Sequence, residues 1–312
     1  MTGPQGQGGS RGRDEADEVF AAHRPLLFTL AYEITGSAAD AEDVVQESYL
    51  RWSRLGHREI AHPRAYLARI ATRQALNQLR TVRRRREEYV GSWLPEPLCT
   101  EPDASEDVLL AESVSTAMLL VLESLGPDER AVFVLRDVFG YEYPEIAEMT
   151  GRTQPAVRQI AHRARSHVRA RRRRHRTDSR AAAEIAGRFL AAAHSGDVRG
   201  LMELMAPDVV QISDGGGKAA AAPRPLVGRE RVARFLVGLA AGEMRSMRAQ
   251  PGTHNAMPSV LFHSGTRLDT VLTIDIEDGL VRGLFAIRNP DKLTAAEAPV
   301  ALTREKEHPW RR

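Results

Sequence analysis

The sequence predicts two helical modules followed by a separate α+β domain. Apolar residues recur at helical spacing from about residue 15 to residue 172, whereas alternating apolar and polar residues appear only after residue 205. A run of arginines, Arg171–Arg174, separates the two patterns. The chain has 312 residues and 42% hydrophobic residues, which is enough for two or three domains with cores of their own.

The composition excludes several classes of protein. The single cysteine, Cys99, excludes an internal disulfide and a zinc site built from several cysteines. No apolar run reaches membrane-spanning length, and MTGPQGQGGSRGR at the N-terminus contains no apolar signal core, so we expect a cytoplasmic protein that does not bind membranes. Residues 1–14 are expected to be disordered. The formal net charge is only +3, so basic character is informative only at the arginine runs 83–86 and 171–174.

The first module begins with an apolar helix predicted over 20–34. Ser37 is placed to cap the next helix, with Asp40 at the capping-box position. The buried stripe of this second helix is predicted to consist of Ala41, Val44, Val45, Ser48, Tyr49 and Trp52. Beside it runs an acidic line, which consists of Asp40, Asp43 and Glu47 with Gln46 next to it. This line is either a solvated acidic face or a docking surface for a basic partner helix.

A third helix is predicted to begin at Pro63. Its inward side is predicted to carry Leu67, Ala71, Ala75 and Leu79, and its outer face Tyr66, Arg69, Arg73, Asn77 and Arg80. An aromatic ring interleaved with arginines suits single-stranded nucleic acid, because bases stack on the ring and phosphates pair with guanidinium groups. The alternative is a solvated basic face, and the nearby arginine run 83–86 favours nucleic acid.

The helical pattern breaks from 91 to 102, where the motif WLPEP occupies 93–97. Two prolines within five residues favour an extended path, and Trp93 and Leu94 are expected to dock on a neighbouring domain because both are costly to leave in water. A helical segment is predicted over 105–125 and another over 129–139, separated by Gly126 and Pro127.

The stretch from Tyr143 to Arg165 reads as two short helices around a tight turn. Gly151 supplies the turn, Thr153 is placed as an N-cap, and Pro155 lies in the first helical turn. The second helix is predicted to bury Val157, Ile160, Ala161, Ala164 and Val168, with Gln154, Arg158 and Gln159 pointing away. This is the arrangement of a helix-turn-helix whose second helix enters the major groove, although an ordinary helical hairpin with a basic face has the same pattern.

The last part of the chain changes character after the second arginine run. Helices are predicted over 181–193, 201–205 and 229–239, and strands over 208–212, 259–262, 268–276 and 280–287. The last two strands are joined by Glu277-Asp278-Gly279, which is typical of a hairpin. This order predicts a separate α+β domain with a curved, mostly antiparallel sheet.

Several motifs together resemble the bacterial sigma factors of the extracytoplasmic-function type. The first module is similar to their second sigma region through AEDVVQESYLRW (41–52) and HPRAYLARIATRQALNQLR (62–80), and the second to their fourth region through LGPDERAVFVLRDVFGYEYPEIAEMTGRTQPAVRQIAHRAR (125–165). The remainder resembles the SnoaL-like, NTF2-like cone domains. WLPEP, DGGGK (214–218) and NPDKL (289–293) recur in the subgroup of these sigma factors that has a fused SnoaL-like tail.

The resemblance implies a multidomain fold: a region 2 helical bundle, a region 4 helix-turn-helix, and an α+β cone domain. The implied boundaries are 15–90 for region 2, 91–104 for the linker, 105–175 for region 4, 178–293 for the SnoaL-like domain and 294–312 for a C-terminal tail. The implied function is to direct core RNA polymerase to specific promoters, under the control of the fused domain. The implied partners are promoter DNA and the β′ clamp and β flap of core polymerase, with no cofactor, no metal and no catalytic residues.

The resemblance also assigns roles to side chains. Polymerase binding is implied for Asp40, Asp43, Gln46 and Glu47, and melting of the −10 element for Tyr66, Arg69, Arg73, Asn77 and Arg80. Recognition of the −35 element is implied for Arg152, Thr153, Gln154, Ala156, Arg158, Gln159, Arg163 and Arg165. Regulatory contacts are implied for Trp93, Leu94, Pro95, Glu96, Pro97, Asp214, Gly215, Gly216, Gly217, Lys218, Asn289, Pro290, Asp291, Lys292 and Leu293, and we expect these three motifs to lie together at one rim of the cone.

Two questions about the tail stay open. One alternative is an enzyme of the SnoaL type tethered to a DNA-binding module, with Asp208, Asp214, His254 and His263 as candidate acid–base residues. Polar residues on strands more often satisfy structural contacts, so a regulatory domain is the favoured interpretation. The second question is whether the cone senses a small-molecule ligand, either apolar or a metabolite.

Overall fold

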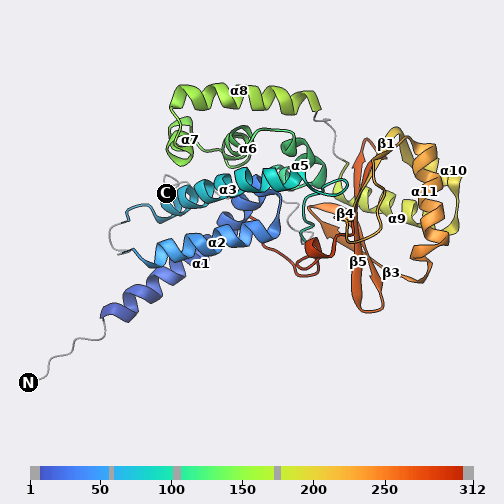
Figure 1. Ribbon diagram of the computed structural model, residues 1–312, viewed down its shortest axis with the longest axis horizontal. Coiled ribbons are helices and arrows are strands. Elements are labelled where there is room, and N and C mark those ends of the chain that lie inside the picture. The colour runs from blue at the N-terminus through green and yellow to red at the C-terminus, as the bar shows by residue number, and fades with distance from the viewer. Residues whose placement is uncertain (1–7, 56–59, 101–106, 172–176, 305–312) are drawn as a thin grey trace, which may run out of the picture. The chain divides into compact units, whose positions relative to one another are not determined.

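The computed structural model describes residues 8–55, 60–100, 107–171 and 177–304 (Figure 1). They form two compact units whose segments alternate along the chain. The first unit comprises Met1–Arg83, Glu123–Ala170 and Ala301–Arg312, and the second comprises Arg84–Leu122 and Arg171–Val300. Within the described ranges, no helix is both long enough and apolar enough to cross a membrane.

Three helices carry the N-terminal module of the first unit: α1 (Gly8–Thr35), α2 (Ala38–Ser53) and α3 (Pro63–Glu87). The expected cap is present, because the Ser37 hydroxyl accepts a hydrogen bond from the Asp40 N–H at 3.1 Å. The expectation of a disordered start does not hold for residues 8–14, which extend α1, while residues 1–7 lie outside the described residues. Once the packed turns around Phe20 have formed, each further residue adds a helical hydrogen bond.

The first unit also contains the helix-turn-helix. Its elements are α6 (Pro127–Phe133), a π-helical turn (Val134–Val138), α7 (Tyr143–Thr150) and α8 (Gln154–Arg171). Gly151 adopts a left-handed conformation with φ of 68°, as a tight turn between two helices requires. The five apolar residues expected to face inward from the second helix of this motif are all buried. The continuous helix expected over 129–139 is instead split by the π-helical turn.

Helices α4 (Val108–Ser113) and α5 (Thr116–Glu123) replace the single helix expected over 105–125, and all of the described residues of α4 belong to the second unit. The break has a local cause. The Ser115 hydroxyl accepts a hydrogen bond from the Met118 N–H at 3.2 Å, so it caps α5 and begins a new helix.

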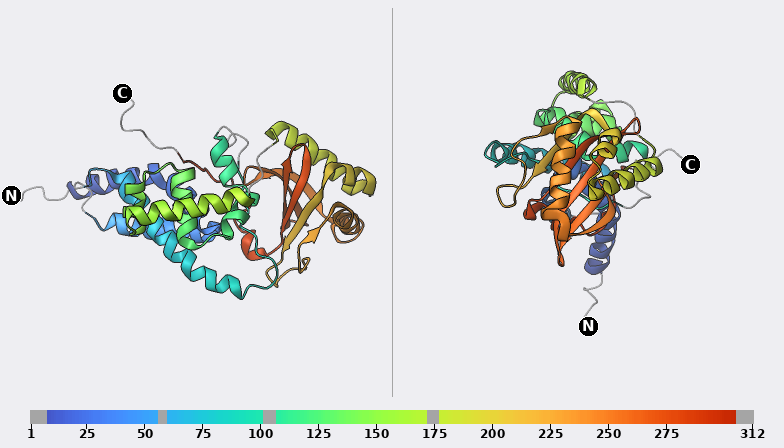
Figure 2. Two further views of the ribbon diagram at one scale, coloured as in Figure 1. Left: turned by 90° about the horizontal axis from the view of Figure 1, so that it is seen from above. Right: turned by 90° about the vertical axis from the view of Figure 1, so that its right-hand side faces the viewer.

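The second unit is built on a six-stranded sheet with strand order β2-β1-β6-β5-β4-β3. In Figure 2 this sheet lies at the yellow to red end of the colour range. Its strands are β1 (Met205–Asp214), β2 (Leu226–Val227), β3 (Arg248–His254), β4 (Met257–Ser264), β5 (Arg267–Glu277) and β6 (Leu280–Ile287). Strands β1 and β6 are parallel and the other neighbours are antiparallel. The predicted hairpin joins β5 and β6, with Asp278 and Gly279 at φ of 51° and 76°.

The two faces of this sheet have different covers. One face packs against α9 (Ser179–Ser195), α10 (Val198–Leu204) and α11 (Arg229–Ala241), with Phe189 and Leu284 in its core. The other face buries Leu94 of the linker beside Phe285 and Ile287, with Leu120 of α5 packed against them. The α+β architecture expected of a SnoaL-like domain is therefore present, and the linker forms part of its core.

Candidate functional site

The acidic line on α2 keeps most of its charge at the surface. Asp43, Gln46 and Glu47 are exposed, and Glu47 pairs with Arg51 one turn along at 3.1 Å. Asp40 is half-buried and accepts a hydrogen bond from the Gln78 amide at 2.8 Å. Three of the four expected polymerase-binding side chains are thus available to a partner, whereas Asp40 also supports the packing of α2 on α3.

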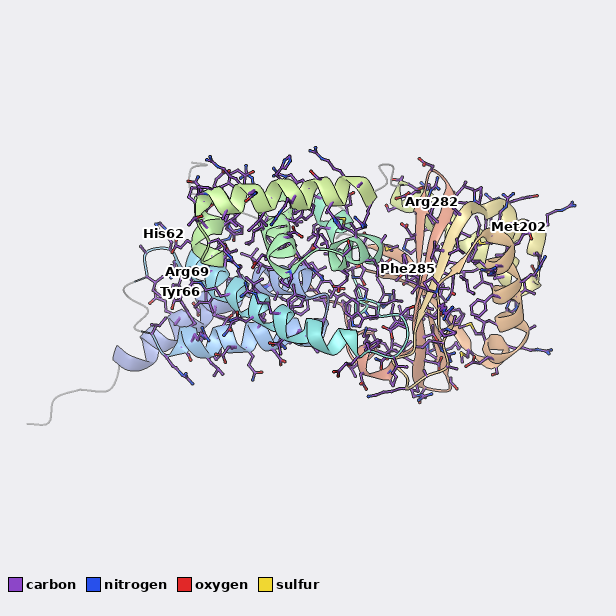
Figure 3. The ribbon with its side chains drawn as sticks, turned by 45° about the horizontal axis from the view of Figure 1, so that its top comes forward. His62, Tyr66, Arg69, Met202, Arg282 and Phe285 are labelled. Atoms are coloured by element: carbon purple, nitrogen blue, oxygen red, sulfur yellow. The ribbon has the colours of Figure 1, made fainter. Side chains whose placement is uncertain are left out.

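The outer face of α3 has the predicted composition. The guanidinium carbon of Arg69 lies 5.3 Å from the centre of the Tyr66 ring, and Figure 3 shows the two side chains next to each other. Arg73, Asn77 and Arg80 follow on the exposed side. The expected inward residues of this helix are buried. The side chains of the arginine run 83–86 lie outside the described residues.

Within the first unit, this face contacts the helix-turn-helix module. Arg69 forms an ion pair with Glu148 of α7, and Arg73 donates hydrogen bonds to the carbonyl oxygens of Glu148 at 2.9 Å and Met149 at 3.3 Å. Arg80 pairs with Asp128 at 2.7 Å. Three arginines expected to hold DNA are therefore paired with the neighbouring module.

The recognition helix α8 presents its polar residues in two groups. Arg158 and Gln159 are exposed near its N-terminus, and the Arg158 guanidinium lies 5.6 Å from the centre of the Tyr143 ring. Arg152, just before the helix, pairs with Asp128 at 2.6 Å. Arg163 and Arg165 pair with carboxylates of the preceding helical segment, at 3.4 Å from Glu129 and 2.8 Å from Asp137. Arg165 is thus the least accessible of these three paired arginines, with 31% of its side chain exposed, whereas Arg152 and Arg163 keep 46% and 59%.

The three motifs WLPEP, DGGGK and NPDKL meet in the second unit, around the carboxylate of Asp214. One of its oxygens accepts the Leu94 N–H at 2.8 Å and pairs with the Lys292 ammonium at 2.7 Å, and the other accepts the Tyr89 hydroxyl at 2.6 Å. The Lys292 ammonium also donates to the Leu94 carbonyl at 2.5 Å and lies 4.2 Å from the centre of the Trp93 ring. Burial, and then the hydrogen bond to Asp214, raise the pKa of Tyr89, so its hydroxyl stays protonated and donates.

The glycines of DGGGK allow the linker to approach this closely. A Cβ on Gly216, whose φ is 58°, would come within 2.3 Å of the Asn289 amide and 2.8 Å of the Tyr89 hydroxyl. A Cβ on Gly215 would lie 2.2 Å from the Ala219 carbonyl oxygen. At the rim of the same cluster, Lys218 forms an ion pair with Asp291. The sequence therefore uses glycine where a side chain would push the motifs apart.

The linker continues from this cluster alongside β3, where Cys99 forms an isolated antiparallel bridge with His254. The Leu98 carbonyl accepts the Asn255 N–H at 2.9 Å, and the Leu98 N–H donates to the Asn255 side-chain oxygen at 3.1 Å. The Thr100 N–H donates to the Thr253 carbonyl at 3.0 Å, and the Asn255 amide also donates to the Val114 carbonyl at 2.8 Å. The C-terminal domain thus holds the linker by its backbone as well as by its side chains.

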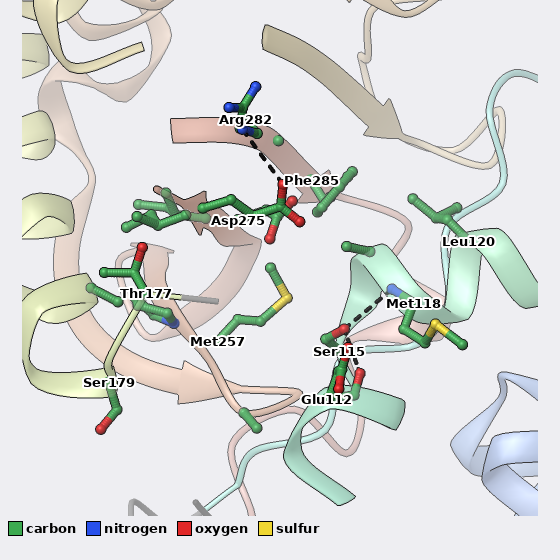
Figure 4. A pocket seen from close by; sticks show the side chains of 18 of the residues that line it. Glu112, Ser115, Met118, Leu120, Thr177, Ser179, Met257, Asp275, Arg282 and Phe285 are labelled. Carbon is green, nitrogen blue, oxygen red and sulfur yellow. Dashed lines mark hydrogen bonds and ion pairs between the residues drawn. The ribbon is translucent and has the colours of Figure 1, made fainter. Parts of the chain in front are cut away.

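A cleft of about 870 Å³ lies on the linker side of the sheet (Figure 4). The labelled side chains around it are Met257, Asp275, Arg282 and Phe285 from the sheet, Glu112, Ser115, Met118 and Leu120 from the α4–α5 segment, and Thr177 and Ser179 at the start of α9. One wall of this cleft is therefore made by helices that precede the helix-turn-helix in the chain.

The four candidate acid–base residues are all engaged in contacts. Asp208 lines the cleft and pairs with Arg282 at 3.4 Å, and Asp214 forms the buried pair with Lys292. His254 bonds through its two ring nitrogens to the Ser259 hydroxyl at 2.7 Å and the Ala296 carbonyl at 2.8 Å, and desolvation lowers its pKa. His263 pairs with Glu297 at 3.0 Å. These contacts give each of the four residues a structural role, and the Nδ1 of His263 is the only buried polar atom of this set without a hydrogen-bond partner among the described residues.

Two residues of the linker site were missed by the sequence analysis. Tyr89 precedes WLPEP by four residues, and an aromatic residue between an arginine run and this motif was the available signal. Asn255, which holds Leu98 and has a φ of 54°, lies in a turn between β3 and β4 that the sequence did not predict. Both residues hold the linker through contacts with residues far away in the sequence, and the spacing of residues along the chain does not predict such contacts.

Comparisons with known proteins agree with this architecture. The family model Sigma-70 region 2 matches residues 19–85, and the model Sigma-70, region 4 matches residues 115–168. The ECF RNA polymerase sigma factor SigJ of Mycobacterium tuberculosis is 39% identical over 291 residues, which cover 89% of this chain and 93% of that protein. A probable ECF RNA polymerase sigma factor of the same species, SigI, is 30% identical over 296 residues, 91% of this chain and 97% of that protein.

A solved structure extends the agreement to three dimensions. The crystal structure of the Mycobacterium tuberculosis sigma factor SigJ covers 89% of this chain and 98% of its own, with 37% identity and a TM-score of 0.73. Sigma factors are not enzymes, so the contacts of the four candidate acid–base residues need no catalytic explanation. With both sigma regions in order and similarity along nearly its whole length, the chain belongs to the extracytoplasmic-function RNA polymerase sigma factors.

Proposed function

We propose that this sigma factor, which directs core RNA polymerase to specific promoters, is regulated by its own C-terminal domain through the linker. The observation that carries the proposal is the Asp214 carboxylate, which binds the Leu94 N–H and the Lys292 ammonium at once. Asp214 is 0% exposed and Leu94 is 0% exposed, so the linker is part of the domain's interior.

The contact is strong enough to act as a regulator. The Leu94 N–H donates to Asp214 and the Leu94 carbonyl accepts from Lys292, and hydrogen bonds to charged groups contribute about 1.5–3 kcal/mol each. The linker adds the burial of Leu94 and Leu98, each of which contributes about 1.5–3 kcal/mol when fully removed from water. A state in which the linker is bound and a state in which it is free can therefore differ by several kcal/mol.

The position of the linker in the chain suggests how the free energy of linker binding could control the two modules. It follows α3, which carries the expected −10 face, and it precedes the helix-turn-helix expected to read the −35 element. Its path limits how far apart the two modules can move. Because the two promoter elements must be engaged together, a bound linker selects either the competent or the inactive spacing.

The same proposal assigns the surfaces of the first unit. Asp43, Gln46 and Glu47 contact the clamp helices of core polymerase, and the outer face of α3 holds the melted −10 strand. Side chains near the N-terminus of α8, Arg158 and Gln159 among them, read base edges of the −35 element.

Transcription in vitro with purified core polymerase tests the regulatory proposal. The template is a promoter selected from a random library by the full-length holoenzyme. We expect the deletion from Asp178 onward, the deletion after Leu293 and Trp93→Ala to change transcription relative to the full-length protein, and the two deletions to differ from each other. The deletions differ because the first removes the whole docking surface for the linker and the second leaves Asp214 and Lys292 in place.

Ser92→Ala is the matched control, since it changes the linker next to Trp93 without touching the ion pair. Equal activity of the two deletions, Trp93→Ala and the full-length protein would show that the domain does not regulate through the linker.

A further inference from the structure

A second cavity lies on the helix side of the sheet, with a volume of about 270 Å³. Its lining is mainly apolar and comes from α11, from strands β1, β5 and β6, and from the loop at 220–222: Phe235, Leu236, Leu239, Leu272, Ala286 and Ala222 are among these residues. This volume is too large for one water molecule and too small for a cofactor of nucleotide size.

Two polar atoms of its lining have no hydrogen-bond partner among the described residues. They are the side-chain oxygen of Gln211 and the Nε–H of Arg288. Gln211 is 2% exposed, and one N–H of its side-chain amide donates to the Ser213 hydroxyl at 2.5 Å. A buried oxygen without a donor costs about 1–3 kcal/mol, so a donor that enters the cavity and reaches this acceptor is favoured by about that amount.

The charge of the lining is already balanced. The Arg288 guanidinium pairs with Glu243 at 2.6 Å and with Asp269 at 2.9 Å, and Glu243 is the acidic residue that lines the cavity with it. An anionic ligand would compete with these two carboxylates, and a cation would face a positive guanidinium. The lining therefore favours a neutral molecule.

We propose that this cavity binds a small neutral apolar molecule with a hydroxyl group, whose O–H donates to the Gln211 oxygen while its body fills the space between α11 and the sheet. A second oxygen on the same molecule would accept from the Arg288 Nε–H. The ligand class follows from one unused acceptor, one unused donor and an apolar remainder.

The cavity is connected to the linker site through Arg288. The backbone N–H groups of Arg288 and Asn289 donate to the Asp214 carbonyl at 2.7 Å and 3.0 Å, and the Arg288 guanidinium donates to the Ala220 carbonyl at 2.7 Å. A ligand that moves Arg288 thus acts directly on the residue that binds Leu94. This step rests on the proposed regulation through the linker, whereas ligand binding itself does not.

Binding is tested on the full chain with three fused-ring probes by fluorescence titration. The probes are 2-naphthol, which is neutral with one hydroxyl, naphthalene, which has no polar group, and 2-naphthoate, which is an anion. We expect saturable binding of 2-naphthol, about tenfold weaker binding of naphthalene because one buried hydrogen bond is lost, and the weakest binding of 2-naphthoate.

Gln211→Met keeps the shape of the side chain and removes the acceptor. It should weaken 2-naphthol binding about tenfold and leave naphthalene binding unchanged. Ala286→Leu and Leu239→Trp fill the cavity from the sheet and from α11, and each should weaken both probes. Val227→Leu adds a methylene group at a surface position and is the control. The proposal would be overturned by the absence of saturable 2-naphthol binding, or by filling variants that bind both probes as tightly as the wild-type chain.

Hydrogen exchange at the Leu94 amide tests the connection to the linker. Saturating 2-naphthol should change its exchange rate in the wild-type chain and leave it unchanged in Ala286→Leu. If 2-naphthol binds and this rate does not move, the connection is wrong while the binding site stands. Neither measurement uses transcription, so the two proposals can fail separately. If the linker regulates transcription but no probe binds, only this inference is wrong. If a probe binds but the linker does not regulate transcription, only the proposed function is wrong.

Discussion

Asp214 and Lys292 form an ion pair 2.7 Å long that is almost completely buried, and both partners also bind the main chain of Leu94. Asp214→Asn removes the negative charge and leaves the Lys292 ammonium without its carboxylate. We expect a loss of about 3–5 kcal/mol in the stability of the second unit, measured by urea unfolding. The matched control is Asp291→Asn, which breaks the exposed pair with Lys218 and should cost less than about 1 kcal/mol. Equal losses in the two variants would show that the buried pair has no special role.

The acidic line of α2 gives a prediction for polymerase binding. Asp43→Ala with Glu47→Ala should leave the fold intact, because both side chains are exposed. Core polymerase should bind the double variant about tenfold to a hundredfold more weakly, since two charge-assisted contacts are lost. Glu42→Ala, which removes a neighbouring exposed charge from the same helix, is the control. Unchanged affinity, measured with labelled sigma factor, would rule out this surface as the docking site.

The ion pair between Arg69 and Glu148 gives a prediction for DNA binding. Glu148→Ala releases Arg69 from α7 and should increase affinity for single-stranded DNA, by up to about fivefold, because exposed pairs are worth no more than about 1 kcal/mol. Fluorescence anisotropy at low salt measures the change. Glu184→Ala changes the net charge equally at a distant exposed site and is the control. An equal gain in both variants would mean that net charge, rather than release of Arg69, is responsible.

The buried His254 predicts a pH dependence of stability. Its pKa is lowered in the folded protein, so the unfolded chain takes up the proton first as the pH falls. Its contribution to stability is complete above about pH 6.5, the ordinary imidazole range, and is lost as the pH drops from there toward the lowered pKa. His254→Gln should flatten the fall in stability between pH 7.5 and pH 5, measured by urea unfolding, while the exposed His194→Gln should leave it unchanged. A wild-type curve that is flat in this range would contradict the prediction.

Much of the fold could be predicted from the sequence because the local patterns agree with the tertiary structure. The third helix begins at Pro63 and the last strand spans Leu280–Ile287, as the helical and alternating patterns indicate. The edge strand β3 was missed, and its sequence explains why. It contains Pro251 and Gly252 and is mostly exposed, so it lacks the alternation that identifies strands, and Thr253 is its one β-branched residue.

Part of the candidate site could likewise be predicted from the sequence and part could not. The meeting of WLPEP, DGGGK and NPDKL was predicted, because exposed apolar residues and consecutive glycines together indicate a close contact. The central position of Asp214 was not, since it was expected as one of fifteen regulatory contacts or as a candidate acid–base residue. The pairing of Arg69 with Glu148 also went unpredicted, because these residues are 79 positions apart and nothing local links them.

The alternation of the two units along the chain has a consequence for synthesis on the ribosome. Leu94 is made 198 residues before Lys292, the side chain that binds its carbonyl oxygen. At about 5–20 residues per second, the linker waits on the order of 10–40 s for its partner, and the helix-turn-helix is completed during that time. Each newly synthesised molecule therefore passes through a period in which its linker is unrestrained, and a nascent chain that ends early stays in that condition permanently.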